Sequence, residues 1–328
     1  MPTDSAVHII DDDDDDQDDI DDHVDDDDND IDDDDTDGAG LVSPIIGNPG
    51  GGVLLGLSGA DLIFGMDGVD YVIAGAGADI ARLDEGDDFA DAGAGDDIVW
   101  AGEGDDDVLG GDGNDMLYGE AGDDWISGDA GNDMIDGGAG NDELYGGTGD
   151  DSFIGRINDG DDTIDGGAGN DTLDLGSLTE AVHVNLGTGV GGRGHVTGSQ
   201  SGTDTLYGVE NVTTGSGNDT IVASNAVNIM DGGAGEDVFV FGSAAAADGD
   251  TILNFEAGDK VDLSGMLAGD DSFTLVTGTP SAGEIAVTHE VREDGEYTVV
   301  VGNIDGGDAE FRISITGNHN LTSSDFNL

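Results

Sequence analysis

An aspartate recurs at every ninth residue over a long stretch of this sequence, and carboxylates at a regular spacing can bind divalent cations. Counted from Gly56, eleven nonapeptides follow one another in one register up to Ile154. Their fourth position is always glycine, the sixth always aspartate and the eighth always apolar. The pattern resumes after a two-residue insertion near Gly155 and Arg156, lapses, and returns in a short block after Thr213.

The aspartates of these repeats are the candidate metal ligands. They are Asp61, Asp70, Asp79, Asp88, Asp97, Asp106, Asp115, Asp124, Asp133, Asp142, Asp151, Asp162, Asp171, Asp219 and Asp237. Calcium takes six to eight oxygen ligands from carboxylates and backbone carbonyls, and glycine-rich loops leave their carbonyls open to an ion. Magnesium needs a rigid octahedral site and keeps its waters, so this donor set favours calcium.

The period of nine excludes an amphipathic helix, whose apolar residues would recur at three and four positions. It predicts a coil of eighteen residues per turn, built twice from a six-residue loop and a three-residue strand whose eighth-position side chain points inward. Glycine permits the backbone conformations that such loops require. The turns then stack into two parallel sheets, and the aspartates into two columns with neighbours about 4.8 Å apart.

Such columns cannot be stable alone. Two carboxylates at this spacing repel by roughly 3 to 4 kcal/mol at an effective dielectric of 20. Fixing nine residues costs on the order of 9 to 18 kcal/mol, whereas one inward side chain contributes only about 1.5 to 3 kcal/mol. A cation between neighbouring aspartates replaces their repulsion by attraction to the shared ion. We therefore expect metal binding and folding to be one reaction. The uninterrupted block of repeats has room for nine ions between its aspartates.

The composition excludes several functions. The 328 residues carry 77 Asp and Glu against 6 Lys and Arg, a net charge of -71, which opposes binding to nucleic acid or anionic lipid. No cysteine is present, so disulfides, thiolate metal sites and cysteine nucleophiles are excluded. No apolar run has the length of a membrane span, and we expect no cleaved secretory signal at the amino end.

An acidic segment precedes the repeats. Between Asp4 and Asp37, 21 of 34 residues are aspartate. Such a block cannot bury enough apolar area to offset its ordering entropy, which predicts a disordered tail. Two interpretations stay open, a solvated and solubilising arm or a low-affinity binder of calcium and mineral surfaces.

The nonapeptide resembles the RTX repeat, a calcium-binding pattern of Gly-Gly-x-Gly-x-Asp-x-apolar-x. The end of the chain resembles the carboxy-terminal domain of serralysin-type secreted metalloproteases. The matching segments are Gly242–Phe255, Gly258–Gly265, Gly302–Gly317 and Leu321–Leu328. The resemblance implies export from a Gram-negative bacterium by type I secretion machinery, which reads an uncleaved carboxy-terminal signal. Asp325, Phe326 and Leu328 match its acidic-then-apolar end, and the chain would fold outside the cell, where calcium is abundant.

Other candidate sites are weaker. The protease zinc motif His-Glu-x-x-His is absent, because the segment from His289 to Glu293 lacks the second histidine. A degenerate calcium-binding loop is suggested by Asn303, Asp305 and Asp308, with a plain turn as the alternative. Trp100 and Trp125 occupy outward positions, either as a contact patch or as partly covered surface aromatics.

The predicted fold is all-β: a parallel β-roll with a β-rich carboxy-terminal cap and a disordered acidic amino-terminal tail. We expect the tail and linker at 1–46, the calcium-binding RTX β-roll at 47–174, a degenerate solenoid spacer at 175–213, a second short RTX block at 214–240 and the serralysin-type secretion domain at 241–328.

The predicted function is that of a secreted, extracellular, non-enzymatic calcium-binding protein with several bound ions. Two alternatives stay open: a calcium-dependent factor that adheres to cell-surface, matrix or mineral ligands, and an accessory module of a secreted hydrolase.

Overall fold

The computed structural model describes residues 44–187, 192–267 and 271–328, all of which belong to one compact unit from Val42 to Leu328. The predicted acidic tail therefore lies almost wholly outside the described residues. Within them no α-helix occurs, and the single helical element is a 3-10 turn, η1 (Ser323–Asp325). The prediction of an all-β chain is confirmed for this part of the sequence.

The strands of the described residues form two sheets. The first sheet has 15 strands in the order β1 (Ile45–Ile46), β3 (Leu62–Phe64), β5 (Ile80–Glu85), β7 (Ile98–Glu103), β9 (Met116–Ala121), β11 (Met134–Ala139), β13 (Ser152–Ile154), β15 (Thr172–Asp174), β19 (Asn211–Thr213), β21 (Ile229–Asp231), β23 (Thr251–Leu253), β28 (Phe311–Thr316), β27 (Gly295–Asn303), β26 (Glu284–Arg292) and β25 (Thr274–Val276).

The second sheet has 14 strands in the order β2 (Val53–Leu55), β4 (Tyr71–Ala76), β6 (Phe89–Ala94), β8 (Asp107–Asp112), β10 (Trp125–Ala130), β12 (Glu143–Thr148), β14 (Thr163–Ala168), β18 (Gly202–Tyr207), β17 (Gly194–Gly198), β16 (Val182–Asn185), β20 (Thr220–Val222), β22 (Val238–Val240), β24 (Lys260–Asp262) and β29 (Phe326–Asn327).

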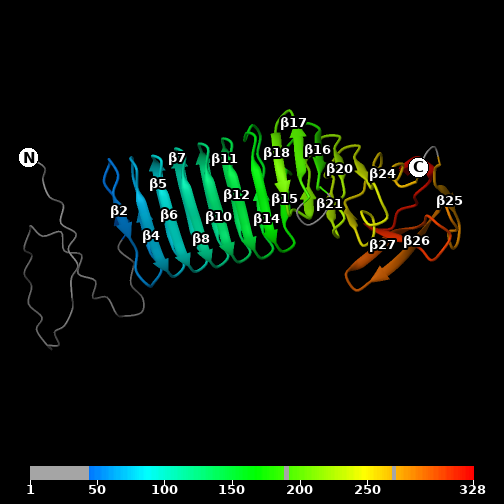
Figure 1. Ribbon diagram of the computed structural model, residues 1–328, viewed down its shortest axis with the longest axis horizontal. Helices are drawn as coiled ribbons and strands as arrows, with labels where there is room; N and C mark the ends of the chain where they lie inside the picture. Colours follow the sequence, from blue (N-terminus) through cyan, green and yellow to red (C-terminus); the bar gives the residue numbers. More distant parts are fainter. Residues whose placement is uncertain (1–43, 188–191, 268–270) are drawn as a thin grey trace, which may run out of the picture. The chain divides into compact units, whose positions relative to one another are not determined.

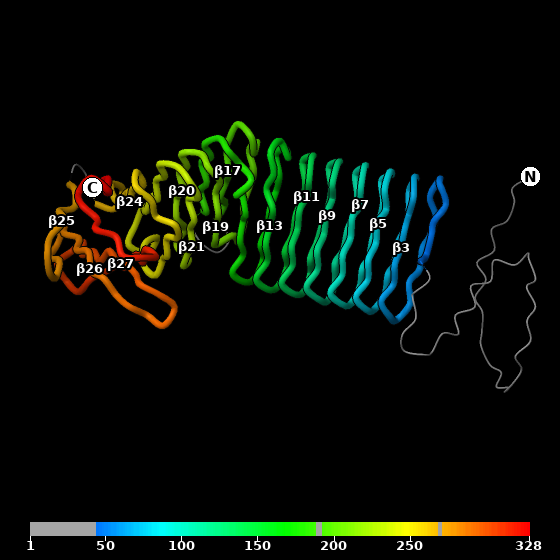
Figure 2. The backbone as a smooth tube through the Cα atoms, turned by 180° about the vertical axis from the view of Figure 1, so that it is seen from behind, coloured from blue at the N-terminus to red at the C-terminus, as the bar shows by residue number. Residues whose placement is uncertain are grey.

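From β1 to β15 consecutive strands alternate between the two sheets, so each turn of the coil adds one strand to each (Figures 1 and 2). Pairing in the repeat block is parallel, and each residue is in register with the residue eighteen positions later. Trp100 of β7, for example, pairs with Tyr118 of β9. The predicted coil of eighteen residues per turn is confirmed.

The strands are longer than predicted. From β4 to β12, and again in β14, they contain six residues rather than three, and the loop shrinks to three residues, from the fourth-position glycine to the sixth-position aspartate. Strand pairing continues past the second position of the repeat because the backbone there is left-handed, with φ of 109° at Gly75 and 127° at Gly102. Asp84, Glu120 and Asp129 hold this conformation at φ of 73°, 74° and 68°, which residues with a Cβ rarely adopt.

The core lies between the sheets. The eighth position points inward as predicted, and Ile63, Ile126 and Phe153 are fully buried there. The first position also points inward, which the sequence analysis missed. Where the eighth position shrinks to Ala81, Leu83 at the following first position supplies apolar volume, and both side chains are at most 2% exposed.

The spacer differs from the expected continuation of the solenoid. The first sheet stays parallel across it, through β13, β15 and β19. In the second sheet β17 is inserted antiparallel to both β16 and β18. Gly198 pairs with Gly202 at the end of a tight hairpin, and the hairpin reverses the chain direction, which a coil of one hand cannot do.

The carboxy-terminal segment forms the expected antiparallel strands. β26 pairs with β27 and β27 with β28 in antiparallel register. β28 also pairs in parallel with β23, and β29 with β24, so both sheets continue into this segment. Phe311 and Phe326 bring its apolar surface into the common core.

Candidate metal centre

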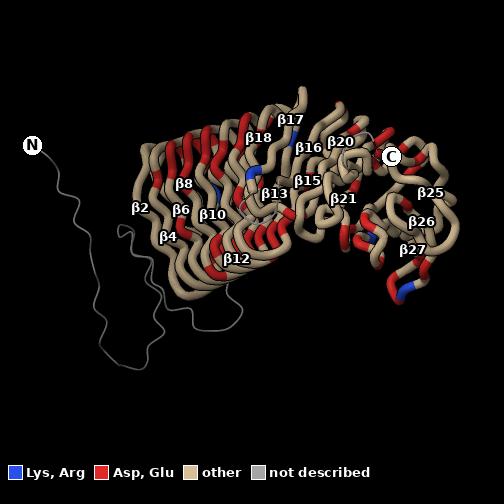
Figure 3. Tube along the Cα trace, turned by 45° about the vertical axis from the view of Figure 1, so that its right-hand side comes forward, with Lys and Arg blue, Asp and Glu red and all other residues tan. Residues whose placement is uncertain are grey.

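The repeat aspartates stand at the start of each strand, where the chain turns from one sheet to the other. Their side chains point inward, because the sixth position has the same parity as the inward eighth position. Every predicted ligand except the partly exposed Asp61 is buried, with at most 8% of its surface accessible. Figure 3 shows acidic residues in rows along both edges of the coil.

A hydrogen-bond ladder runs through each column. The backbone N–H of each aspartate donates to Oδ1 of the aspartate one turn later. Asp97 donates to Asp115 at 2.8 Å, and Asp106 donates to Asp124 at 2.8 Å. The structure therefore brings the predicted residues together in the two expected columns, and backbone groups fix one oxygen of nearly every carboxylate, Asp70 being the exception.

The other carboxylate oxygen, Oδ2, has no hydrogen-bond partner. This holds for Asp70, Asp79, Asp88, Asp97, Asp106, Asp115, Asp124, Asp133, Asp142, Asp151, Asp171, Asp219 and Asp237. A buried carboxylate oxygen without a partner costs several kcal/mol in a folded protein. A whole column of them requires a proton or a cation at each level.

Glycine at the first position creates the space that such an ion needs. A Cβ added to Gly110 would lie 2.5 Å from Asp115 Oδ2 and 3.0 Å from the carbonyl oxygen of Gly128. At Gly119 it would collide in the same way with Asp124 Oδ2 and the Gly137 carbonyl. We call each such space, between an aspartate Oδ2 and a carbonyl oxygen of the next turn, a cradle. Both groups are hydrogen-bond acceptors, so a cradle suits a cation.

The electrostatics agree with this geometry. Burial, followed by repulsion from neighbouring carboxylates, raises the pKa of Asp106 to about 8, and burial likewise raises the pKa of Asp142 to about 7. Hydrogen bonds from the ladder lower these values only in part. The metal-free carboxylates therefore hold protons at a pH where aspartate is normally charged, and a bound cation would remove that penalty.

The remaining ligands must come from the backbone. Among the described residues, no three Asp, Glu or His side chains converge closely enough to hold a metal ion by themselves. A cradle offers carboxylate and carbonyl oxygens together, the donor types that calcium accepts. The residues present thus fit calcium held partly by main-chain oxygens.

Four acidic residues that the sequence analysis missed extend the columns. Asp162 N–H donates to Asp204 Oδ1 at 3.1 Å, and Asp237 N–H donates to Asp259 Oδ1 at 3.0 Å. Glu210 and Asp250 accept in the same way from the backbone of other turns. An aspartate two residues before an apolar residue was the available signal for the three aspartates. Glu210 had none.

Asn228 shows what happens where an amide replaces the carboxylate. Its Nδ2 donates to the Glu210 carbonyl at 2.7 Å and to Ser224 Oγ at 2.9 Å, and its Oδ1 accepts from Ser224 N–H at 2.7 Å. The protein itself therefore satisfies this side chain. Only the charged members of the columns are left with orphaned oxygens.

The weaker candidates have structural roles. Glu290 pairs with Arg292 and Arg312, so the sequence next to His289 forms ion pairs on a strand rather than a zinc site. In the loop suggested as a degenerate calcium site, Asn303 Oδ1 accepts a hydrogen bond from Gly306 N–H at 2.7 Å, as in a plain turn.

Two histidines far apart in the sequence lie together. The rings of His183 and His195 are 5.6 Å apart on β16 and β17, strands that the inserted hairpin makes neighbours. Burial lowers the pKa of His183.

Comparison with protein families defines the class of protein. Residues 46–81, 84–117 and 118–153 match the RTX calcium-binding nonapeptide repeat, which makes this a calcium-binding RTX protein with a β-roll. Residues 162–328, half of the chain, match the family described as Peptidase M10 serralysin C terminal. The chain belongs to this family. Together the two matches imply a secreted protein. Neither match includes a peptidase catalytic domain, and no helix in the described ranges could span a membrane.

Solved structures give only distant similarities. A subunit of the mannuronan C5-epimerase of Azotobacter vinelandii is 20% identical over 71% of this chain and 77% of its own, with a TM-score of 0.17. The extracellular lipase LipA of Serratia marcescens is 14% identical over 73% of this chain and 41% of its own, with a TM-score of 0.20. Comparison with curated proteins gives no match.

Proposed function

We propose that this protein is a secreted, non-enzymatic calcium-binding protein that folds when calcium enters the cradles of its two columns. The predicted aspartates, from Asp61 to Asp237, would supply the carboxylate ligands, one ion lying between each pair of neighbours. The observation that carries the proposal is the columns of buried Oδ2 atoms without partners. Where the first position is glycine, as before Asp115, Asp124 and Asp133, such an atom lies beside a carbonyl oxygen of the next turn. Calcium would neutralise the charge that otherwise keeps successive turns apart.

The location of the proposed export signal supports folding after secretion. Phe326 is only 6% exposed and pairs with Val261 in the second sheet. Thr322 and Asp325 close a capping box around η1, and Lys260 Nζ donates to the Ser324 carbonyl at 2.8 Å. A type I secretion machinery could not read this segment in the folded chain. An unfolded chain in a calcium-poor cytoplasm would leave it accessible.

The five-part division of the chain remains part of this proposal, with boundaries at 46, 174, 213 and 240. Sheet pairing is continuous across the last three boundaries, so these parts would fold together. A Gram-negative source would follow from the proposed export route.

A calcium titration tests the proposal. We expect an unordered circular dichroism spectrum in EGTA and a cooperative gain of β signal between about 0.1 and 1 mM calcium, the range of extracellular calcium modules. Magnesium at the same concentrations should give no transition. Isothermal titration should find several ions per chain. A β-rich, protease-resistant chain in EGTA at about pH 7.5, where the unfolded-state aspartates are fully charged, would refute coupled folding.

A further inference from the structure

A hollow of about 440 Å³ lies on the outer face of the first sheet, whereas the column aspartates point inward. Trp100 on β7, Tyr118 on β9 and Asp136 on β11 line it at the ninth position of their repeats, which points outward. Residues Arg156 and Asn158 form its far wall. Its size is within the usual range for small-ligand sites.

One wall is an aromatic pair. The rings of Trp100 and Tyr118 are stacked with centroids 5.6 Å apart and planes at 6°. β9 lies between β7 and β11, so Tyr118 has Trp100 on one side and Asp136 on the other. Asp136 is too small to cover the second face of the tyrosine ring. The small residues Gly138 and Ala139 also line the hollow and leave its volume open.

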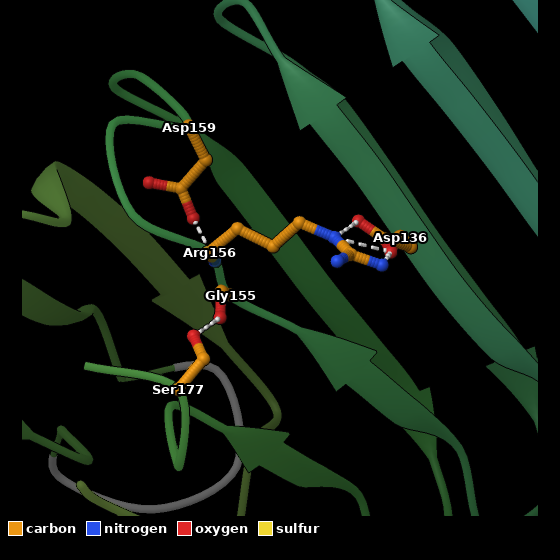
Figure 4. A network of polar contacts seen from close by, with 5 residues as sticks. All are labelled: Asp136, Gly155, Arg156, Asp159 and Ser177. Carbon is orange, nitrogen blue, oxygen red and sulfur yellow. Dashed lines mark hydrogen bonds and ion pairs between the residues drawn. The ribbon is translucent and has the colours of Figure 1, made fainter.

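The opposite wall is the two-residue insertion that interrupts the nonapeptide register. Arg156 Nε donates to both oxygens of Asp136, at 2.9 and 2.7 Å (Figure 4). The same loop is fixed by Asp159 Oδ2, which accepts from Arg156 N–H, and by Ser177 Oγ, which donates to the Gly155 carbonyl at 3.1 Å. The insertion is thus held in place above the sheet before any ligand arrives.

These groups suit a ring with apolar C–H faces and a rim of hydroxyl groups. The face of an aromatic ring carries partial negative charge and attracts C–H groups. The Glu120 carboxylate, the Arg156 guanidinium and the Asn158 amide supply acceptors and donors around it. Asp136 is buried beneath Arg156, which binds both of its oxygens, so it holds the guanidinium in place. Two carboxylates against one guanidinium, in a chain of net charge -71, oppose an anionic ligand.

We propose that this hollow binds a neutral saccharide, with one pyranose ring stacked on Tyr118 and its hydroxyls bonded to Glu120, Arg156 and Asn158. The site goes beyond the proposed calcium-dependent folding, because it lies on the opposite face of the strands from the cradles. It would give the secreted protein a ligand on glycan surfaces.

The chain provides a matched control on its other sheet. Trp125 of β10 and Tyr145 of β12 also form an aromatic pair, with centroids 5.6 Å apart, but at a tilt of 41° and outside this hollow. The two tryptophans are the only ones in the sequence. Trp125→Phe therefore leaves Trp100 as the sole fluorescent reporter, and Trp100→Phe leaves Trp125.

The test uses the full chain in calcium, with folding verified by circular dichroism. Cellohexaose, maltohexaose, laminarihexaose, mannohexaose and the anionic polygalacturonate are titrated by calorimetry and by fluorescence. We expect at least one neutral oligosaccharide to bind and to change Trp100 emission in the Trp125→Phe variant, while Trp125 emission in Trp100→Phe stays constant. Tyr118→Ala should weaken binding about tenfold, whereas Tyr145→Ala should leave it unchanged.

A further variant covers the case in which Tyr118→Ala does not fold. Asn158→Gly keeps the left-handed backbone, with φ of 62° in the parent, and removes only the amide; it should weaken binding about threefold. Three results would overturn the proposal: no neutral oligosaccharide binding at about 10 mM, binding of polygalacturonate alone, or equal losses in Tyr118→Ala and Tyr145→Ala. A chain that stays unfolded in calcium would instead refute the proposed function.

Discussion

Replacing one column aspartate by its uncharged isostere should change stability in opposite directions with and without calcium. Asp124 is the best position. Its Oδ1 accepts from Asp106 N–H at 2.8 Å, and its Oδ2 lies in the cradle beside the Gly137 carbonyl. In Asp124→Asn the amide oxygen can keep the first bond. The amide nitrogen would donate to the Gly137 carbonyl, much as Asn228 is satisfied by protein atoms.

The size of the effect follows from the pKa. Burial, with repulsion from Asp105 and Asp123, raises the pKa of Asp124 from 3.8 to about 6. Above that pH the charged group costs the metal-free fold about 3 kcal/mol, which the amide would recover. In calcium the same change removes a buried charge from a cation. The loss of one partner of a buried ion pair costs about 3 to 5 kcal/mol.

Two stability measurements at about pH 7.5, one of folding in EGTA and one of unfolding in calcium, separate these effects. In EGTA, a titration with the stabilising osmolyte trimethylamine N-oxide should fold Asp124→Asn at a lower osmolyte concentration than the parent. In calcium, guanidinium chloride should unfold the variant at a lower concentration. The control is Asp123→Asn, an exposed neighbour whose Oδ1 accepts from Asn141 N–H at 2.7 Å. Its effect should be under about 0.5 kcal/mol in either assay.

The cradle interpretation would be refuted if Asp124→Asn raised stability in calcium, or if Asp123→Asn matched it in both assays.

Three other changes test separate parts of the structure. Gly110→Ala places a Cβ against Asp115 Oδ2 and the Gly128 carbonyl, and should reduce the number of ions counted by calorimetry and lower stability in calcium by about 1 to 3 kcal/mol. Gly59→Ala, with no atom within 4 Å of the added Cβ, is its control, and equal ion counts in both variants would argue against the cradles. Asp129→Gly should be about 1 kcal/mol more stable than Asp129→Ala in calcium, because φ is 68° at this position and alanine is strained there. Thermal unfolding of the two variants measures the difference, and equal stability would contradict backbone strain at this residue. In EGTA the pKa is raised to about 8 at Asp106 and to about 6 at Asp88, so the metal-free folded chain binds more protons than the unfolded chain. The stability of the metal-free fold should therefore increase as the pH falls from about 8 to about 5. A circular dichroism spectrum that stays unordered down to about pH 5 would contradict this prediction.

The repeat block was predictable because its information is local and periodic. A strict register of glycine, aspartate and an apolar residue permits one stacking, since a slip of a single residue would expose Ile63 and Ile126 and bury polar neighbours. The same register placed Asp106 and Asp124 in one column before any coordinates were known. The carboxy-terminal strands followed from simple alternation at Val299 and Ile313.

Prediction failed where pairing depends on distant segments. β17 lies antiparallel between β16 and β18, and nothing local in Gly194–Gly198 states which strands will flank it. Asp204 enters a column only because the hairpin returns the chain to the second sheet, 42 residues after Asp162. The inward first position was missed because glycine occupies it in many repeats and contributes no apolar signal.

The coil, its period and its two acidic columns follow from the repeat alone, because a nine-residue period fixes which side chains share a face. Which carboxylate oxygen is bonded, and which is left free beside a carbonyl, is settled only when the turns pack on one another. That outcome depends on the vertical contact between successive turns, which no single repeat contains. The hollow beside Tyr118 arises in the same way, from an insertion packed against strands far away in the chain.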